Sequence, residues 1–256
     1  MANILITGAN QGIGYYLVEQ ALKDGNHIAV LDLATDNLES LSQFFPGCLI
    51  YYKVDVCDER QIQSAVTDTI EQFHRIDIAI HNACLCTFGS ETDTDLDIYE
   101  KVFDVNYYGA LRLAKSVLPY MKKQGSGRII FTSSGVGVTG FVGISPYAST
   151  KGALEALAKC LRLEYASEGI SFQIIHPPLT RTKSAAPLPV PKEFMADPKT
   201  VGYGLAKNIL SKRFIICHSL GQKIQTIACY IFPIKMGRLM SKMAMRYVKS
   251  INDENI

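Results

Sequence analysis

The sequence has no long uncharged apolar segment and no recognisable export signal. Its longest apolar candidate, residues 224–234, is far shorter than the roughly 18 to 20 residues that span a bilayer as a helix. The first residues, Met1 to Thr7, lack both a basic start and a small-residue cleavage site. These absences argue against an integral membrane protein and lead us to expect a cytoplasmic location.

Paired cysteines are also missing, although the chain contains seven cysteines. The number is odd and the only close pair is Cys84 and Cys86, so a disulfide framework is not expected. His81 lies near this pair, but no second cluster of metal ligands follows, and free cysteine is among the most buried residue types. We therefore interpret the thiols as structural and expect no metal; the thiols are Cys48, Cys57, Cys84, Cys86, Cys160, Cys217 and Cys229.

The sequence lacks internal repeats and low-complexity tracts, and its charges are unevenly distributed. A chain of 256 residues that is 48% hydrophobic and 20% charged can bury a sizeable core, and we expect a single domain over residues 1–256. Residues 192–256 contain 11 Lys or Arg against 4 Asp or Glu, whereas the preceding part is net acidic. An acidic body argues against nucleic-acid binding and directs attention to the basic C-terminal part.

Short apolar runs rich in strand-forming residues alternate with longer segments in which apolar residues recur every three or four positions. This alternation predicts an α/β protein with a doubly wound, mostly parallel sheet and covering helices. The predicted helices are 14–23, 59–74, 105–122 and 147–167. The predicted strands are 4–7, 28–33, 49–54, 76–81, 128–133 and 171–176.

The C-terminal third differs in composition from the rest. Six prolines between Pro177 and Pro198 interrupt regular structure, so we interpret residues 179–199 as a surface loop over a ligand site. This part offers apolar residues and no positioned acidic clamp, which favours a lipophilic or bulky substrate. A basic amphipathic helix follows over 233–249, with an apolar stripe of Met236, Leu239, Met240, Met243 and Tyr247 beside cations at Lys235, Arg238, Lys242, Arg246 and Lys249.

Two interpretations of this helix are open. An apolar stripe usually packs on the protein's own body or on a neighbouring subunit, and methionines adapt to either surface. The less favoured alternative is peripheral contact with an anionic membrane, which the cations would attract.

The first predicted strand runs directly into a helix through Thr7-Gly8-Ala9-Asn10-Gln11-Gly12-Ile13-Gly14. Glycine at these positions permits a sharp turn and a close approach of a ligand to the backbone, where a side chain would block a pyrophosphate. The helix start offers free N–H groups and the positive end of a dipole to phosphates. Strand, glycines and helix in this order predict a dinucleotide-binding turn.

Two aspartates follow the next two strands. Asp32 ends the second strand, and a carboxylate there can accept hydrogen bonds from the adenosine ribose hydroxyls while repelling a 2′-phosphate. Because Leu33 follows and the glycine turn lacks Lys and Arg, NAD is favoured over NADP, although NADP stays possible. Asp55, after the third strand, is a candidate partner for the adenine amino group.

Tyr147 and Lys151 are four residues apart in a predicted helix, so their side chains share one face. A neighbouring ammonium favours the phenolate and so makes tyrosine a usable base near neutral pH. Ser134 closes a strand at the carboxyl edge of the sheet, where a hydroxyl can polarise a carbonyl. Asn106 begins a helical stretch, where its amide either carries a water relay or caps the turn.

Together these motifs resemble the short-chain dehydrogenase/reductase family in its single-domain form of about 250 residues. The likeness covers residues 3–182 and includes Asn82-Ala83 and Tyr147-Ala148-Ser149-Thr150-Lys151. It implies a Rossmann-like sheet of about seven strands, a homodimer or homotetramer, and a catalytic tetrad of Asn106, Ser134, Tyr147 and Lys151. The residues expected to bind the dinucleotide are Gly8, Asn10, Gln11, Gly12, Ile13, Gly14, Asp32, Asp55, Val56, Asn82, Ala83, Tyr147, Lys151, Pro177, Thr180 and Thr182.

In the tetrad that the resemblance implies, Tyr147 donates or accepts the hydroxyl proton during hydride transfer, Lys151 lowers its pKa and binds the ribose, and Ser134 orients the substrate oxygen. Two departures from the family pattern lie outside the tetrad. His81 and Cys84 stand where the family usually has Asn and Gly, in Asn-Asn-Ala-Gly, and Pro178 replaces the glycine of Pro-Gly. Cys84 adds a side chain beside the cofactor, and Pro178 restricts the loop at the nicotinamide.

The motifs therefore predict an NAD(H)-dependent oxidoreductase that interconverts a secondary alcohol and a ketone or aldehyde. The alternative from another class is a catalytically silent NAD(H)-binding sensor or interaction protein on the same fold, against which the intact tetrad speaks. A sugar-nucleotide epimerase or dehydratase is disfavoured because such proteins are typically longer and space their glycines as Gly-x-x-Gly-x-x-Gly.

Overall fold

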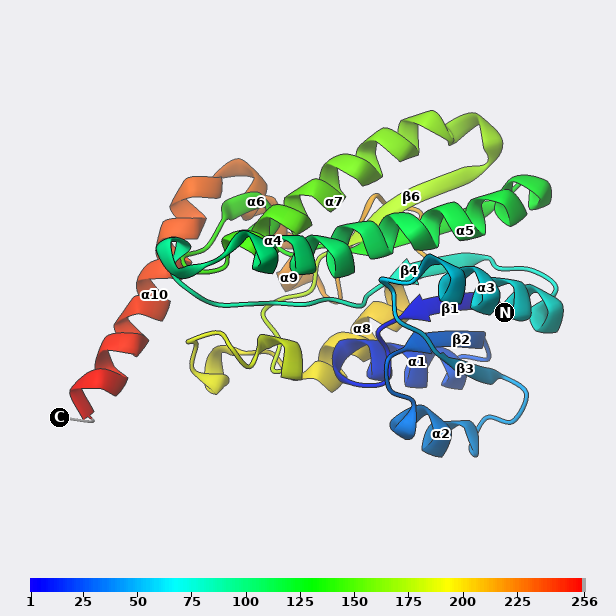
Figure 1. Ribbon diagram of the computed structural model, residues 1–256, viewed down its shortest axis with the longest axis horizontal. Helices are drawn as coiled ribbons and strands as arrows, with labels where there is room; N and C mark the ends of the chain where they lie inside the picture. Colours follow the sequence, from blue (N-terminus) through cyan, green and yellow to red (C-terminus); the bar gives the residue numbers. More distant parts are fainter. Residues whose placement is uncertain (255–256) are drawn as a thin grey trace.

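A seven-stranded, all-parallel sheet forms the centre of the protein (Figure 1). The computed structural model describes the backbone of residues 1–254 and the side chains of residues 1–247. The strand order is β3-β2-β1-β4-β5-β6-β7. The strands are β1 (Asn3–Thr7), β2 (His27–Asp32), β3 (Leu49–Lys53), β4 (Ile78–His81), β5 (Gly127–Thr132), β6 (Ile170–Ile175) and β7 (Ile215–Ile216).

This sheet confirms the predicted doubly wound Rossmann-like architecture. Each of the six predicted strands is present within two residues of its expected ends, and β7 is the additional one. The strand order reverses direction between β1 and β4, which lie side by side with Thr7 opposite His81. At such a reversal the two connecting chains leave in opposite directions, so a crevice opens at the carboxyl ends of the strands.

Helices cover both faces of the sheet because successive side chains of each strand point to opposite sides. Ile4 and Ile6 pack with Leu17 on one face, whereas Leu5 packs with Leu113 on the other. The first cluster joins α1 (Gly12–Lys23), α2 (Asp36–Ser42) and α8 (Pro198–Asn208). The second joins α3 (Glu59–Phe73), α5 (Gly109–Gln124) and α7 (Ser145–Glu164).

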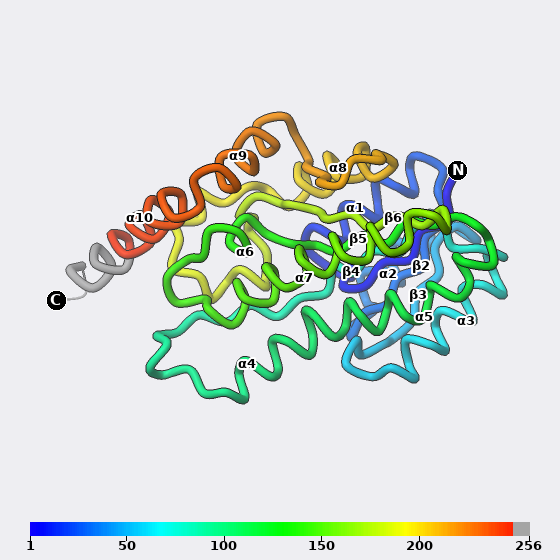
Figure 2. Tube along the Cα trace, turned by 90° about the horizontal axis from the view of Figure 1, so that it is seen from above, coloured from blue at the N-terminus to red at the C-terminus, as the bar shows by residue number. Residues whose placement is uncertain are grey.

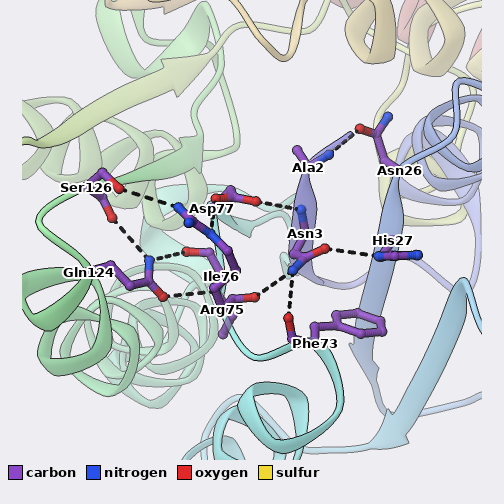
Figure 3. A network of polar contacts seen from close by, with 10 residues as sticks. All are labelled: Ala2, Asn3, Asn26, His27, Phe73, Arg75, Ile76, Asp77, Gln124 and Ser126. Carbon is purple, nitrogen blue, oxygen red and sulfur yellow. Dashed lines mark hydrogen bonds and ion pairs between the residues drawn. The ribbon is translucent and has the colours of Figure 1, made fainter.

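The amino edge of the sheet is closed by a polar network (Figure 3). The Asn3 side-chain amide donates to the carbonyl oxygens of Phe73 at 2.9 Å and Arg75 at 3.1 Å, and its oxygen accepts from the His27 ring at 3.1 Å. The backbone N–H of Asn3 donates to Asp77 at 2.9 Å. These contacts tie β1 to β2 and to the turn before β4, so this edge is occupied by the protein's own groups.

The proline-rich segment forms a loop closed on itself rather than an extended connection. Thr180 pairs with Ala196 in an isolated parallel bridge, and the loop contains the short 3-10 helices Lys183–Ala185 and Lys192–Phe194. Pro198 occupies the first turn of α8, where Asp197 caps the helix through Thr200 N at 2.9 Å. The last proline of the predicted loop therefore begins a helix, a position at which its missing N–H carries no cost.

The C-terminal part consists of α9 (Leu220–Ile231) and α10 (Pro233–Glu254). Both contact α6 (Val136–Thr139), and Figure 2 shows them along one outer edge of the molecule, away from α3 and α5. Gly237 approaches the carbonyl of Thr139 so closely that a Cβ would lie 2.5 Å from it, and Ser241 accepts a hydrogen bond from Val142 N at 3.2 Å. Ala244 is buried.

This packing agrees with the favoured interpretation that α10 docks on the protein's own body. Met236 and Met240 of the predicted stripe are half-buried on this side, while Lys235, Arg238 and Lys242 are exposed. The side chain of Lys249, the last predicted cation, lies outside the described residues. Among the residues that the structure describes, no helix is both long and apolar enough to cross a bilayer.

Candidate active site

The carboxyl edge of the sheet opens into a cavity of about 600 Å³. It is bordered by the turn after β1, by the ends of β2 to β6, by the loop that follows β6, and by α9 and α10. Among the residues predicted as site members, it is lined by Gly8, Gln11, Gly12, Ile13, Asp32, Asp55, Val56, Asn82, Ala83, Ser134, Tyr147, Lys151, Pro177, Thr180 and Thr182. The other three predicted residues, Asn10, Gly14 and Asn106, lie behind the cavity wall.

The glycine turn folds as predicted, but its three glycines serve different purposes. Gly8 and Gly12 have left-handed φ values of +68° and +64°, which favour glycine. A Cβ at Gly8 would lie 2.4 Å from the Ala83 Cα, and one at Gly14 would lie 2.6 Å from the Gly8 carbonyl oxygen. Packing between chain segments therefore requires glycine at Gly8 and Gly14, whereas the sequence interpretation had explained both glycines by ligand access. Gly12 faces the cavity beside Thr182.

Asn10 has a structural role at the start of α2. Its side-chain oxygen accepts from the backbone N–H groups of Asn37 at 3.0 Å and Leu38 at 3.3 Å, and its amide donates to Asp36 at 2.9 Å. Its own N–H donates to an oxygen of Asp32 at 2.8 Å. Asn10 therefore orients the carboxylate of Asp32, and its predicted contact with a cofactor stays a prediction.

Asp32 and Asp55 both reach the cavity from the ends of their strands. Asp32 keeps its carboxylate in place through Asn10 and through Ala34 N at 3.2 Å, and Asp55 accepts from Cys57 N at 2.9 Å. Each carboxylate retains oxygen lone pairs for further donors, since two oxygens offer about four acceptor sites. Both can therefore receive hydroxyl or amino donors of a ligand.

Asn82 fixes the crevice between β1 and β4. Its side-chain amide donates to the Gly8 carbonyl at 2.6 Å, and its N–H donates to the Thr7 hydroxyl at 3.1 Å. Thr132, at the end of β5, donates to the Asn82 side-chain oxygen at 3.4 Å. One side chain thus connects the carboxyl ends of three adjacent strands.

Asn106 lies fully buried within a π-helical turn, Asp104–Tyr108, between α4 (Leu96–Phe103) and α5. Its side-chain oxygen accepts from Leu85 N at 2.7 Å, and its amide donates to Leu85 O and to the Thr150 hydroxyl, both at 3.0 Å. It is not a cap at a helix start, which was one of the two predicted alternatives. It instead anchors the segment after β4 to α7, one turn from Tyr147 and Lys151.

Ser134, Tyr147 and Lys151 come together at one wall of the cavity. Lys151 is almost fully buried; its ammonium nitrogen donates to the Thr132 carbonyl at 2.8 Å and lies 5.3 Å from the centre of the Tyr147 ring. The Ser134 hydroxyl faces the same cavity and acts to lower the pKa of the Tyr147 phenol. The helical spacing of four residues therefore brings phenol and ammonium onto one face, as predicted.

The electrostatics of this wall differ from the sequence expectation. Burial raises the pKa of Tyr147 well above its usual value, the thiols of Cys84 and Cys86 act in the same direction, and the Ser134 hydroxyl opposes them. Burial also lowers the pKa of Lys151. The lowering of the tyrosine pKa that the ammonium was expected to cause is not seen in the protein alone, where desolvation sets the direction of the shift. The phenol is therefore protonated at neutral pH.

His81, one departure from the family pattern, has a structural role. Its ring is fully buried, where one nitrogen donates to the Val105 carbonyl at 3.1 Å and the other accepts from the Thr7 hydroxyl at 3.1 Å. Burial, with Lys151 adding, lowers the pKa of His81 to about 3, so the ring is neutral. The described residues hold no group of three or more His, Cys, Asp or Glu that would suit a metal ion.

The other departures lie at the cavity itself. Cys84 and Pro178 both line it, as do their neighbours Ala83 and Pro177. The Pro178 carbonyl accepts from the Thr180 hydroxyl at 2.7 Å, which folds the start of the loop toward the cavity. Both replacements therefore border the ligand space without filling it.

Sequence reasoning missed a buried polar cluster behind this wall. Glu155, one turn beyond Lys151, accepts from the Ser133 hydroxyl at 3.0 Å and from the Tyr230 hydroxyl, and pairs with the His176 ring nitrogen at 2.7 Å. Burial alone would raise the pKa of Glu155, but His176, Tyr230 and Ser133 outweigh it and hold the pKa below its usual value. The signal in the sequence that could have revealed this residue is the position of Glu155 four residues after Lys151.

The outer wall of the cavity is apolar and comes from the C-terminal helices and the loop. Met236, Leu239, Met240 and Met243 of α10 line it opposite the phenol side, together with Phe194 of the loop. Cys229 and Thr226 of α9 join them. Thus the stripe predicted from the sequence forms one side of the ligand space.

The comparisons with known proteins agree with this geometry. Residues 2–192 match the family model described as short chain dehydrogenase. The chain is 35% identical over 214 residues to Oxidoreductase UcpA of Salmonella typhimurium, covering 82% of this chain and 80% of the relative. It is 32% identical over 186 residues to 2-(R)-hydroxypropyl-CoM dehydrogenase of Xanthobacter autotrophicus, covering 70% and 74% of the two chains.

Solved structures show the same fold. A short-chain dehydrogenase from Streptomyces avermitilis superposes with a TM-score of 0.78 at 24% identity, covering 90% of this chain and 92% of the other. A 3-ketoacyl-(acyl-carrier-protein) reductase from Brucella melitensis, complexed with NADH, has a TM-score of 0.76 at 19% identity, covering 85% and 94%. The Rossmann-like fold and the family match together define an α/β oxidoreductase. The chain belongs to the short-chain dehydrogenase family, whose members act on CH–OH groups.

Proposed function

We propose that this protein is an NAD(H)-dependent oxidoreductase that interconverts a lipophilic secondary alcohol and its ketone or aldehyde, with Tyr147 as the acid/base. The observation that carries the proposal is the phenol of Tyr147 in the cavity wall, with the Ser134 hydroxyl in the same wall and the buried ammonium of Lys151 5.3 Å from the centre of its ring. A proton donor and a second hydroxyl facing one space suit a substrate oxygen that gains or loses a proton.

The residues at the inner half of the cavity fit a dinucleotide. Gly12 leaves backbone exposed at the start of α1, where helix N–H groups and the helix dipole favour phosphate oxygens. Asp32 and Asp55 would hold the adenosine, and Asn82, Thr180, Thr182 and Lys151 would surround the nicotinamide end. When bound, this cofactor supplies or accepts the hydride. The negative charge of Asp32, which would repel a 2′-phosphate, and the absence of Lys and Arg from the glycine turn support NAD over NADP.

The chain's own residues manage the proton. In the reductive direction the protonated phenol of Tyr147 donates to the substrate oxygen as negative charge develops there, and Ser134 donates a second hydrogen bond to the same oxygen. Lys151 stabilises the resulting phenolate, whose formation the burial of Tyr147 otherwise opposes. In the oxidative direction the phenolate form of Tyr147 accepts the hydroxyl proton, while Ser134 keeps its hydrogen bond to the substrate oxygen.

The apolar outer wall supports a lipophilic substrate. The methionines of α10 and the loop residue Phe194 offer flexible, uncharged contacts around whatever extends from the reacting carbon. A substrate with a charged tail would lose its hydration there without a paired charge. The homodimer or homotetramer implied by the family resemblance stays a prediction.

A spectrophotometric screen tests this function. NADH oxidation is followed with ketones of increasing apolar size, alongside small polyol-derived ketones. We expect turnover that improves with apolar size until the cavity is filled. Turnover confined to small polar ketones would contradict the assignment of a lipophilic substrate. If no ketone of the panel is turned over although NADH binds, the protein is a cofactor-binding sensor and not an enzyme.

A further inference from the structure

The outer face of α9 carries an exposed apolar stripe that the sequence analysis did not identify. Its members recur at helical spacing and have exposed fractions between 48% and 72%; they are Leu220, Ile224, Ile227 and Ile231. The opposite face of the same helix is buried through Gln222, Thr226 and Cys229. The helix is therefore docked by its more polar side and presents its most hydrophobic side outward, the reverse of an ordinary surface helix.

The stripe continues across the junction into α10. Phe232 is 50% exposed and Ile234 is 61% exposed, so exposed large apolar side chains continue from α9 into the first turn of α10. Isolated exposed apolar residues need no explanation, but a row that is contiguous by its helical spacing, as on α9, marks an interaction surface.

Cations accompany this row. The Lys235 ammonium lies over the Phe232 ring at 5.5 Å from its centre, and Lys223 is the exposed neighbour of Ile224. Arg238, Lys242 and Arg246 are exposed on the following turns of α10. The sequence has no Asp or Glu between Asp197 and Asp253. Apolar side chains bordered by cations without any anion match the chemistry of an anionic lipid surface, whose interior accepts the former and whose headgroups attract the latter.

We propose that the α9 stripe, with Phe232 and Ile234, docks on an anionic lipid surface. A second copy of the chain is a poorer occupant, because a two-fold contact would set the same unneutralised cations of both copies close together. A lipid surface instead supplies opposite charge to every cation at once.

The position of the surface relates it to the cavity. Leu239 and Met243 line the cavity and are also 54% and 47% exposed, so the apolar cavity wall reaches the outer surface of α10. A docked protein would thus hold its cavity wall beside the lipid. That an apolar substrate enters from this side rests on the proposed function, whereas the docking itself does not.

Vesicle sedimentation of the full chain tests the docking. The probes are phosphatidylcholine vesicles with and without phosphatidylserine, at about 0.1 M and about 0.5 M salt, where screening of the cations differs strongly. The variant Ile224→Gln/Ile227→Gln removes the centre of the stripe. Its matched control is Leu163→Gln, because Leu163 is 81% exposed on α7 and lies outside the proposed surface.

We expect the wild type and Leu163→Gln to sediment with anionic vesicles, more at low salt. The double variant should bind at least about tenfold more weakly, since each lost isoleucine burial is worth roughly a factor of ten or more. Equal sedimentation of all three proteins, or none by the wild type, would overturn the docking. So would a concentration-dependent dimer that the double variant abolishes in sedimentation velocity. Vesicle binding needs no turnover, so a failed docking leaves the proposed function untouched, and an inactive enzyme leaves the docking untouched.

Discussion

The amino edge and the carboxyl edge of the central sheet both carry polar residues, but these residues have opposite roles at the two edges. At the amino edge, both the amide nitrogen and the oxygen of the Asn3 side chain form hydrogen bonds with neighbouring chain segments, and the edge is closed. At the carboxyl edge, Asp32 and Asp55 keep unused acceptor sites and face a cavity. Satisfied polar groups stabilise a fold, whereas the remaining hydrogen-bonding capacity at the other edge is available to a ligand.

This comparison separates two kinds of mutational effect. Changes at the carboxyl edge should alter turnover or cofactor choice while leaving the free energy of unfolding nearly unchanged. Changes at the amino edge should lower the free energy of unfolding while leaving turnover and cofactor choice nearly unchanged. The first three predictions below test that division, and the fourth tests the buried Glu155 cluster behind the cavity wall.

Of the next four variants, Ser134→Ala is expected to have the largest effect. Loss of one hydrogen-bond donor to the substrate oxygen should lower turnover about 100-fold to 1000-fold, as removal of a single stabilising donor does in other active sites. NADH affinity and urea unfolding should match those of the wild type. A turnover within twofold of wild type would show that the hydroxyl faces the cavity without contacting the reacting oxygen.

At the amino edge, Asn3→Ala should destabilise the fold. The substitution leaves the carbonyls of Phe73 and Arg75 without their donor, and an unsatisfied buried polar group costs about 1–3 kcal/mol. The free energy of unfolding in urea should fall by that amount, while turnover per folded molecule stays constant. A large loss of turnover with unchanged stability would break the proposed division between the two edges.

Cofactor choice should respond to Asp32→Asn. This variant keeps an acceptor oxygen for the ribose but removes the charge that repels a 2′-phosphate. We expect the ratio of NADPH to NADH dissociation constants to fall about tenfold, equivalent to about 1.4 kcal/mol. Titration by nucleotide fluorescence measures both constants. An unchanged ratio would indicate that the Asp32 carboxylate does not approach the adenosine ribose.

The smallest effect, on the order of 1 kcal/mol, is expected for the pH dependence contributed by Glu155. Its pKa is lowered in the folded protein, so the unfolded chain takes up the proton first as the pH falls. The stabilisation is therefore full above the unfolded-state pKa of about 4.3 and is lost as pH falls through the folded value. The stability difference between wild type and Glu155→Gln should be largest near neutral pH and shrink near pH 4. A difference independent of pH would contradict this linkage.

Much of the fold was predictable because its signals are local. The glycine turn, the alternation of strands and helices, and the Tyr147–Lys151 spacing each depend on residues close in sequence. The carboxyl edge followed from these, since parallel strands bring the residues after them to one side of the sheet.

What the sequence concealed depends on contacts between distant residues. Glycine is required at Gly14 because of its close contacts with Gly8 and Asn82. The role of Asn10 comes from its hydrogen bond at the start of α2. The Glu155 cluster joins four chain segments that no spacing connects, namely α7, α9 and the ends of β5 and β6. The raised pKa of Tyr147 reflects burial, which composition does not report. The sequence interpretation missed the α9 stripe because it considered residues 224–234 only as a helix that could span a bilayer, for which they are too short.

The most direct test of the central claim is NADH binding and NADH oxidation measured on one preparation of Tyr147→Phe. The account predicts NADH affinity within about twofold of wild type and turnover lowered about 100-fold to 10,000-fold, because only the proton carrier is removed. Turnover close to that of the wild type would contradict the account, since the phenol would then not be the group that moves the proton.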